Sequence, residues 1–150
     1  MSIKFAQKKY NISAVPADIS EFPVFIIGIS PGKQRKGNKN YIVWEGNRSG
    51  DFLFNSLKDI NNLYFTNMSN YINPTAEELY SGIRELRLDI AFYKPRLVIL
   101  LGNKTLALCC THIVPFHSIN MCYFQHPSYI LRFNKDKVKY INRIREAITR

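Results

Sequence analysis

The chain is 150 residues long, which fits one domain with a hydrophobic core and leaves no need for a second domain. It carries 21 Lys and Arg but only 11 Asp and Glu, and its net charge of +10 favours a polyanionic partner such as DNA. No apolar run approaches the roughly 20 residues of a membrane span, so we expect no membrane association.

Three cysteines, Cys109, Cys110 and Cys122, form an odd set without a Cys-x-x-Cys pair, and the N-terminus lacks the layout of a signal peptide. These features predict a reduced, cytoplasmic protein, and we expect it to be a monomer. Residues 1–22 carry little periodic signal, which predicts an N-terminal arm or an edge strand within a single domain of residues 1–150.

Four apolar runs predict β-strands, in chain order Val24–Ile29, Leu63–Thr66, Leu97–Leu101 and Met121–Phe124. The runs are nearly continuous rather than alternating, which is typical of parallel strands covered on both faces.

The segments between the strands predict helices and one loop. The helices run from Ser49 or Gly50 to about Ile60, from the capping box of Thr75 and Glu78 to Pro95, briefly after Gly102, and over the basic stretch Lys135–Thr149. The polar stretch Lys33–Asn40 predicts a loop. Alternating strands and helices predict an α/β fold with three layers, α/β/α, around a central four-stranded parallel sheet.

Each apolar run ends in a short motif: GISPG at residues 28–32, FTN at 65–67, VILLG at 98–102 and HPSYILR at 126–132. The carboxyl ends of parallel strands share one rim of the sheet, and open α/β folds bind their ligand at that rim. The motifs therefore predict a single shared pocket.

The order and content of these motifs resemble the uracil-DNA glycosylase superfamily, most closely its family 4 branch. That branch reads roughly G-E-A-P-G, P-F-V-G-x-A-G-x-L-L, Y-I-T-N, K-P-x-x-I-V-x-L-G and H-P-A-Y-L-L-R. The corresponding stretches here are GISPG, WEGNRSGDFL from Trp44 to Leu53, YFTN, KPRLVILLG and HPSYILR. The resemblance covers roughly residues 23 to 145 and implies a protein that flips a base out of DNA and hydrolyses its N-glycosidic bond.

The resemblance also implies roles for individual residues. The first motif would hold the base and the attacking water, with Ser30 beside Gly28, Ile29, Pro31 and Gly32. Asn67 would read the Watson-Crick edge of the base, and His126 would stabilise the charge that develops on the departing base. A stacking ring would come from Trp44 or Tyr41, between which the alignment does not decide. DNA contacts would come from Ser128, Tyr129 and Arg132 on a loop, and from Lys33, Arg35 and Arg48, whereas His112 and His117 match no motif and are expected to be incidental.

The first motif departs from the family pattern. Family 4 has a glutamate where this chain has Ile29, and the mismatch-specific branch has an asparagine where this chain has Ser30. A serine hydroxyl is a poor general base without a partner, and Glu45 and Asp51, the acidic residues nearest the rim by sequence, match no family position. A catalytically silent reader of a modified base is therefore the alternative to an enzyme. An unrelated nucleotide-using enzyme is disfavoured because no phosphate-loop or complete dinucleotide fingerprint occurs.

Many family 4 enzymes hold an iron-sulfur cluster on four cysteines, two of which precede the first motif. This chain has no cysteine before Cys109, so we expect no cluster, no other cofactor and no metal.

Overall fold

The computed structural model describes residues 23–29, 48–69 and 74–150. Four strands, β1 (Val24–Gly28), β2 (Leu63–Asn67), β3 (Leu97–Leu101) and β4 (Met121–Phe124), form one parallel sheet in the order β2-β1-β3-β4. The predicted four-stranded parallel sheet is confirmed.

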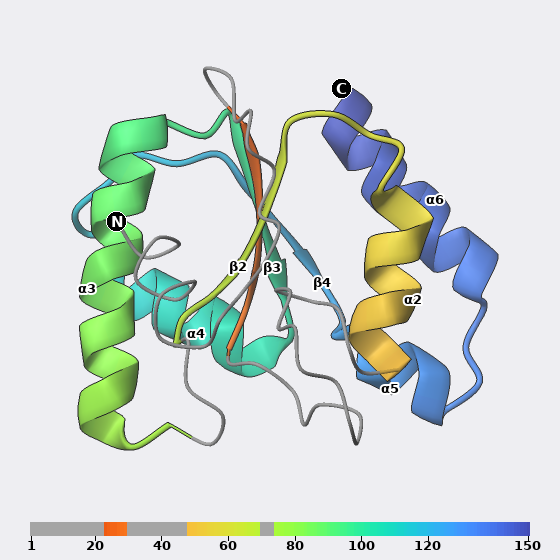
Figure 1. Cartoon of the computed structure of the whole chain (residues 1–150), viewed down its shortest axis with the longest axis horizontal. Coiled ribbons are helices and arrows are strands. Elements are labelled where there is room, and N and C mark those ends of the chain that lie inside the picture. The colour runs from red at the N-terminus through yellow and green to blue at the C-terminus, as the bar shows by residue number, and fades with distance from the viewer. Residues whose placement is uncertain (1–22, 30–47, 70–73) are drawn as a thin grey trace, which may run out of the picture.

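Five helices cover the sheet in the described part of the chain: α2 (Arg48–Leu57), α3 (Ala76–Tyr93), α4 (Asn103–His112), α5 (Pro127–Arg132) and α6 (Lys137–Thr149). Figure 1 shows α3 and α4 on one face of the sheet and α2, α5 and α6 on the other. This is the predicted three-layer α/β/α architecture.

Alternate side chains of β1, β2 and β3 enter two separate cores, because successive residues of a strand point to opposite faces. Val24 and Ile26 of β1 pack in the cluster that includes residues of α2, α5 and α6. Phe25 and Ile27 pack in the cluster that includes residues of α3 and α4. Both faces of the central strands are therefore buried away from solvent, which explains their continuous apolar sequences.

The predicted capping box opens α3. The Thr75 Oγ1 accepts a hydrogen bond from the Glu78 backbone N–H at 3.1 Å, and Glu78 Oε1 accepts one from the Thr75 backbone N–H at 3.1 Å. The helix ends at Tyr93, where Lys94 adopts a left-handed conformation with φ of 49° before Pro95. Both ends of this helix agree with the sequence prediction.

Two expectations near the C-terminus are wrong. The segment after His126 is the helix α5 and not a loop, because Pro127 occupies the first helical position and the His126 side chain accepts a hydrogen bond from the Ser128 backbone N–H. Strand β4 is not covered on both faces: it lies at the edge of the sheet, and Met121 and Tyr123 stay 36% and 38% exposed.

Helix α6 is fixed against the rest of the domain by apolar and polar contacts. Tyr140, Ile144 and Ile148, four residues apart, are buried in the same core as α2. Arg145 donates two hydrogen bonds to the Asp59 carboxylate, at 2.9 and 2.7 Å, and a third to the Ser56 carbonyl.

The expected arm or edge strand of residues 1–22 and the expected loop of Lys33–Asn40 lie outside the described residues. Within the described residues, no helix is both long and apolar enough to cross a membrane.

Candidate functional site

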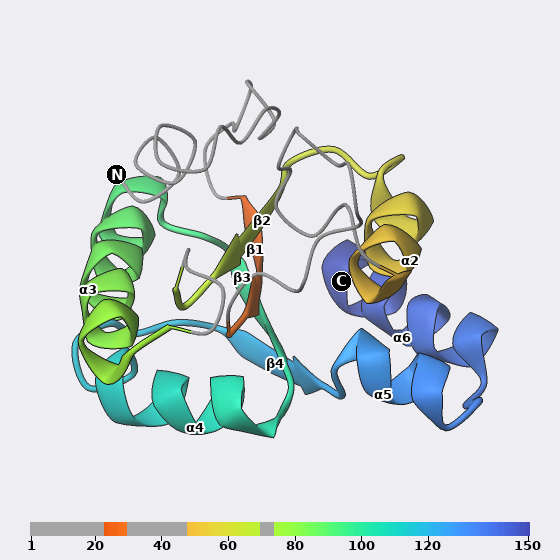
Figure 2. The same ribbon diagram turned by 60° about the horizontal axis from the view of Figure 1, so that its bottom comes forward.

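The carboxyl ends of the four strands meet at one rim of the sheet, at the lower end of Figure 1. Gly28, the last residue of β1, pairs with Asn67, the last residue of β2, and Leu101 pairs in the same way with Phe124. Helix α4 begins directly after β3, and α5 begins soon after β4. Figure 2 shows α5 next to the end of β4, and α5 also packs against α2. The rim is thus the position at which parallel sheets bind ligands.

Asn67 carries a buried polar group that faces this rim without a protein partner. The residue is 5% exposed, and its Oδ1 accepts no hydrogen bond from the part of the chain that the structure describes. Strand alternation puts the side chain on the face of α2, α5 and α6, next to Gly28, which has no side chain. A buried amide oxygen without a donor costs roughly 1–3 kcal/mol, so a ligand that donates to it would gain affinity.

The backbone around Asn67 is held by hydrogen bonds that extend the β1–β2 ladder. The Met68 N–H donates to the Gly28 carbonyl at 2.8 Å, and the Ser69 N–H donates to the Ile29 carbonyl at 2.8 Å. Gly28 is therefore the end of a strand and not the start of a loop, and the Ile29 side chain packs against the core on the α3 and α4 face.

Gly82 of α3 lets the helix approach this segment closely. A Cβ added to Gly82 would lie 2.1 Å from the Met68 carbonyl oxygen and 3.0 Å from the Ser69 Cα. The sequence motifs do not single out this residue, although a glycine inside a helical pattern is a signal of close backbone contact.

His126 lies at the start of α5 and its ring has a defined hydrogen-bonding role. Its Nδ1 accepts a hydrogen bond from the Ser128 backbone N–H at 3.1 Å and lies 2.7 Å from the Ser128 hydroxyl oxygen. A backbone N–H can only donate, so Nδ1 carries no proton and the proton of the neutral ring is on Nε2. The ring can therefore donate through Nε2.

Burial keeps this ring neutral. Desolvation lowers the pKa of His126 below its usual value of 6.5, because burial removes part of the hydration of the charged imidazolium. At neutral pH His126 is an uncharged hydrogen-bond donor.

Gly102 joins β3 to α4 next to His126. Its φ is 94°, a conformation that disfavours side chains, and its N–H donates to the Phe124 carbonyl at 2.9 Å. A Cβ at this position would lie 3.6 Å from the His126 Cβ, an ordinary contact distance. The backbone angle, and not a lack of space, thus explains why glycine is required.

The other predicted site residues fall into two groups. Those that the structure describes lie on two helices: Arg48 is the exposed first residue of α2, and Ser128, Tyr129 and Arg132 lie on α5 and are exposed. The remainder lie outside the described residues: Ser30, Pro31, Gly32, Lys33, Arg35, Tyr41 and Trp44.

The cysteines do not fit the four-cysteine cluster of family 4. The chain has three cysteines in total, one fewer than the cluster needs. Cys109 is buried in α4, and burial raises the pKa of its thiol to about 11, which disfavours the thiolate that binds metals. Among the described residues, no group of three or more His, Cys, Asp or Glu could hold a metal ion.

Comparison with known protein families finds a match that covers most of the chain. The family model for the uracil DNA glycosylase superfamily matches residues 17–149, which includes all four strands and all described helices. No curated protein matches the chain.

Proposed function

The chain belongs to the uracil DNA glycosylase superfamily, and from this premise we propose that it binds a base flipped out of DNA and hydrolyses the N-glycosidic bond of that base. The observation that carries the proposal is the state of His126, a neutral ring whose Nε2 is the donor. When the bond to the sugar breaks, negative charge develops on the departing base, and a fixed neutral donor stabilises that charge without giving up its proton.

Asn67 supports the proposal from the opposite end of the rim. Two strands separate β2 from β4, so their backbones are roughly 14 Å apart at a spacing of about 4.8 Å per strand. Asn67 and His126 can then reach toward a flat base from two sides. The buried Asn67 amide offers an acceptor and a donor, the combination that reads a Watson-Crick edge.

We expect Asn67→Ala to abolish discrimination among bases, because the only polar group proposed to read the edge of the base is removed. Affinity for DNA without a target base should change little, since contacts to phosphates do not depend on Asn67. Competition binding with oligonucleotides that differ in one base tests this. Exposed Asn142 on α6 provides the matched control, as Asn142→Ala should keep the base preference.

Activation of the attacking water is the step of the proposed reaction that the described residues explain least. Ile29, at the position of the family 4 glutamate, has an apolar side chain packed into the core, where it provides no proton acceptor. This observation favours a second candidate function, a catalytically silent protein that flips and reads a modified base with the same pocket.

A cleavage screen separates the two functions. Oligonucleotides carrying uracil, mismatched or modified bases are incubated with the protein, and alkaline strand scission reports abasic sites. We expect cleavage of at least one base, and faster cleavage by Ile29→Glu or Ser30→Asn, which restore the family side chains. If no base is cleaved by any of the three proteins while one modified base is bound selectively, the protein is a reader and not an enzyme.

A further inference from the structure

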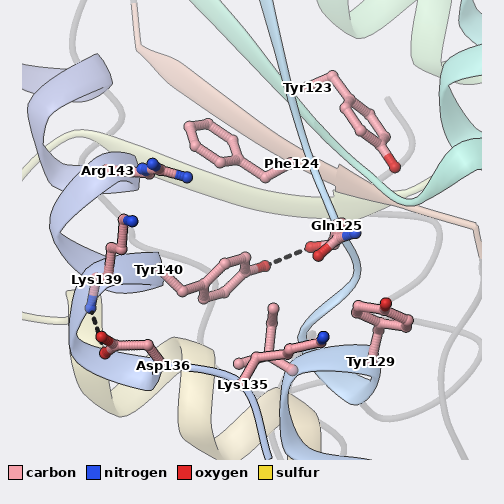
Figure 3. Close-up of a pocket in the computed structure, with 10 residues that line it drawn as sticks. Tyr123, Phe124, Gln125, Tyr129, Lys135, Asp136, Lys139, Tyr140 and Arg143 are labelled. Atoms are coloured by element: carbon pink, nitrogen blue, oxygen red, sulfur yellow. Dashed lines mark hydrogen bonds between the residues drawn. The ribbon is translucent and has the colours of Figure 1, made fainter. Parts of the chain in front are cut away.

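A groove beside the rim is lined by aromatic and cationic side chains that have no role in the proposed hydrolysis step. It has a volume of about 520 Å³ and lies between the outer edge of β4, α5 and α6 (Figure 3). Its walls include the aromatic residues Phe124, Tyr129 and Tyr140 and the cations Lys135, Lys139 and Arg143. The volume is within the range of about 300–1,000 Å³ that is typical of pockets for small ligands or single ligand units.

The cations of the groove are available to a ligand. In the part of the chain that the structure describes, the side chains of Lys139 and Arg143 make no hydrogen bond or ion pair, whereas Arg145 on the same helix is bound to Asp59. The groove contains one carboxylate, Asp136, and its Oδ1 accepts the Lys139 backbone N–H to cap α6. The groove therefore attracts an anion.

The aromatic walls are suited to a base next to that anion. Tyr129 is 37% exposed, and the Lys135 amine lies 5.8 Å from the centre of its ring. Tyr140 also lines the groove, and its ring is held in place because its hydroxyl donates to the Gln125 carbonyl at 2.6 Å (Figure 3). Aromatic rings combined with cations are the usual surface for an unpaired nucleotide, whose base stacks while its phosphate is neutralised.

Residues that line the groove lie close to His126 in the chain. Gln125 and Tyr129, which line the groove, flank His126 in sequence, and the Tyr129 N–H donates to the His126 carbonyl at 3.0 Å. We propose that the groove holds an unpaired nucleotide of the same DNA strand, next to the flipped one, with its phosphate at Lys139 and Arg143 and its base at Tyr129. This inference rests on the proposed function, because it takes His126 as the position of the flipped nucleotide.

A peptide strand added to the edge of β4 is the competing occupant, and the hydrogen bonds disfavour it. The Asn120 and Phe124 carbonyls face β3, so the Gln125 carbonyl faces the open edge. The Tyr140 hydroxyl occupies that carbonyl. An added strand would have to displace the hydrogen bond between Tyr140 and Gln125. The proposed nucleotide would bind through its base and phosphate and would leave this hydrogen bond in place.

The test compares two pairs of charge reversals within α6 or at its C-cap. Lys139→Glu/Arg143→Glu changes the groove, and Lys137→Glu/Arg150→Glu makes the same change in charge at exposed residues that do not line it. Fluorescence anisotropy measures binding of a thymidine oligonucleotide of about 12 nucleotides, as a single strand and in a duplex, over a range of salt concentrations. We expect the groove pair to lower single-strand affinity about tenfold or more. The salt slope should fall by roughly 0.7, because the two cations are proposed to neutralise one phosphate and each phosphate lost from a single-strand footprint reduces the slope by about 0.7.

Tyr129 tests the aromatic part of the proposal. Tyr129→Leu should lower single-strand affinity about fivefold or more without changing the salt slope, and Tyr129→Phe should recover most of the affinity. Thermal unfolding of each variant checks that the fold is retained.

The inference would be overturned by equal reductions in affinity from the two charge-reversal pairs, by tighter binding of duplex than of single strand, or by equal affinity for thymidine monophosphate and the oligonucleotide. Binding of a Glu-rich peptide in place of the oligonucleotide would do the same. The assay needs no cleavage, so failure of the glycosylase proposal, with no base released, is distinguishable from failure at the groove.

Discussion

Replacing His126 by Ala is expected to lower the single-turnover cleavage rate about 100- to 1,000-fold, while the affinity for DNA changes little. The size of the effect follows from the role proposed for His126, a fixed donor to a charge that exists mainly in the transition state. The ground-state base carries little of that charge, so binding is weakened less. The measurement is single-turnover cleavage of a base that the wild-type protein releases, beside equilibrium binding of the same oligonucleotide.

The pH profile gives an independent readout of the same residue. Because burial lowers the pKa of His126 from 6.5, the neutral ring should persist below pH 6.5, and cleavage should fall only as the pH drops through the lowered pKa. The contribution of this group to stability has the same sign, since it is complete above the unfolded pKa and is lost as the pH falls through the folded one. In the His126→Ala variant, this fall of the cleavage rate at acidic pH should be absent. His117→Ala, in the segment between α4 and β4, should retain the loss of rate at acidic pH. A loss that persists in His126→Ala would belong to another group.

Gly82→Ala is expected to destabilise the domain by about 1–2 kcal/mol, against the usual effect of this substitution in a helix. Alanine raises helix propensity by roughly 1 kcal/mol relative to glycine. The new Cβ would, however, lie 2.1 Å from the Met68 carbonyl oxygen, and overpacking of this kind costs about 1–3 kcal/mol or more. Since the clashing atom belongs to buried backbone, the cost exceeds the gain, and urea unfolding should show a lower midpoint.

The neighbouring residue supplies the control for this prediction. Ser81 is exposed on α3, so Ser81→Ala should be neutral or slightly stabilising. Gly82→Ala should also weaken base discrimination, because Met68 follows Asn67 directly. A Gly82→Ala protein as stable as the Ser81→Ala protein would show that α3 can shift away from Met68 at no cost.

The fold was predictable because its strongest signals are local. Buried parallel strands must be apolar on both faces, so Val24–Ile29 and Leu97–Leu101 were visible as continuous runs. The Thr75 capping box and Pro95 mark helix ends by local hydrogen bonding and sterics. Helix α5 was missed because its cap is the ring of His126, and histidine is not among the usual N-cap residues. The exposure of β4 was missed because strand order, and not strand sequence, decides which strand lies at the edge.

Within the candidate site, the sequence motifs could identify single residues, and the roles proposed for those residues stay predictions. Asn67 and His126 follow from their motifs, and the structure brings both to the same rim. The role of Gly82 depends on the distance between α3 and Met68, which no single segment contains. The groove depends likewise on the packing of α6 against β4. The spacing of Lys135, Lys139 and Arg143, four residues apart, is visible in the sequence, but it does not reveal what faces those side chains.

The hydrogen bonds from Met68 and Ser69 to β1 bear on how the pocket could be re-engineered. They anchor the main chain immediately after Asn67, so the position of its Cα changes little when the side chain is exchanged. New preferences for a base should therefore be accessible by substituting residue 67 alone, for example Asn67→Asp or Asn67→Ser, without redesign of the surrounding scaffold. A library confined to this one codon would then test whether residue 67 sets the proposed base preference.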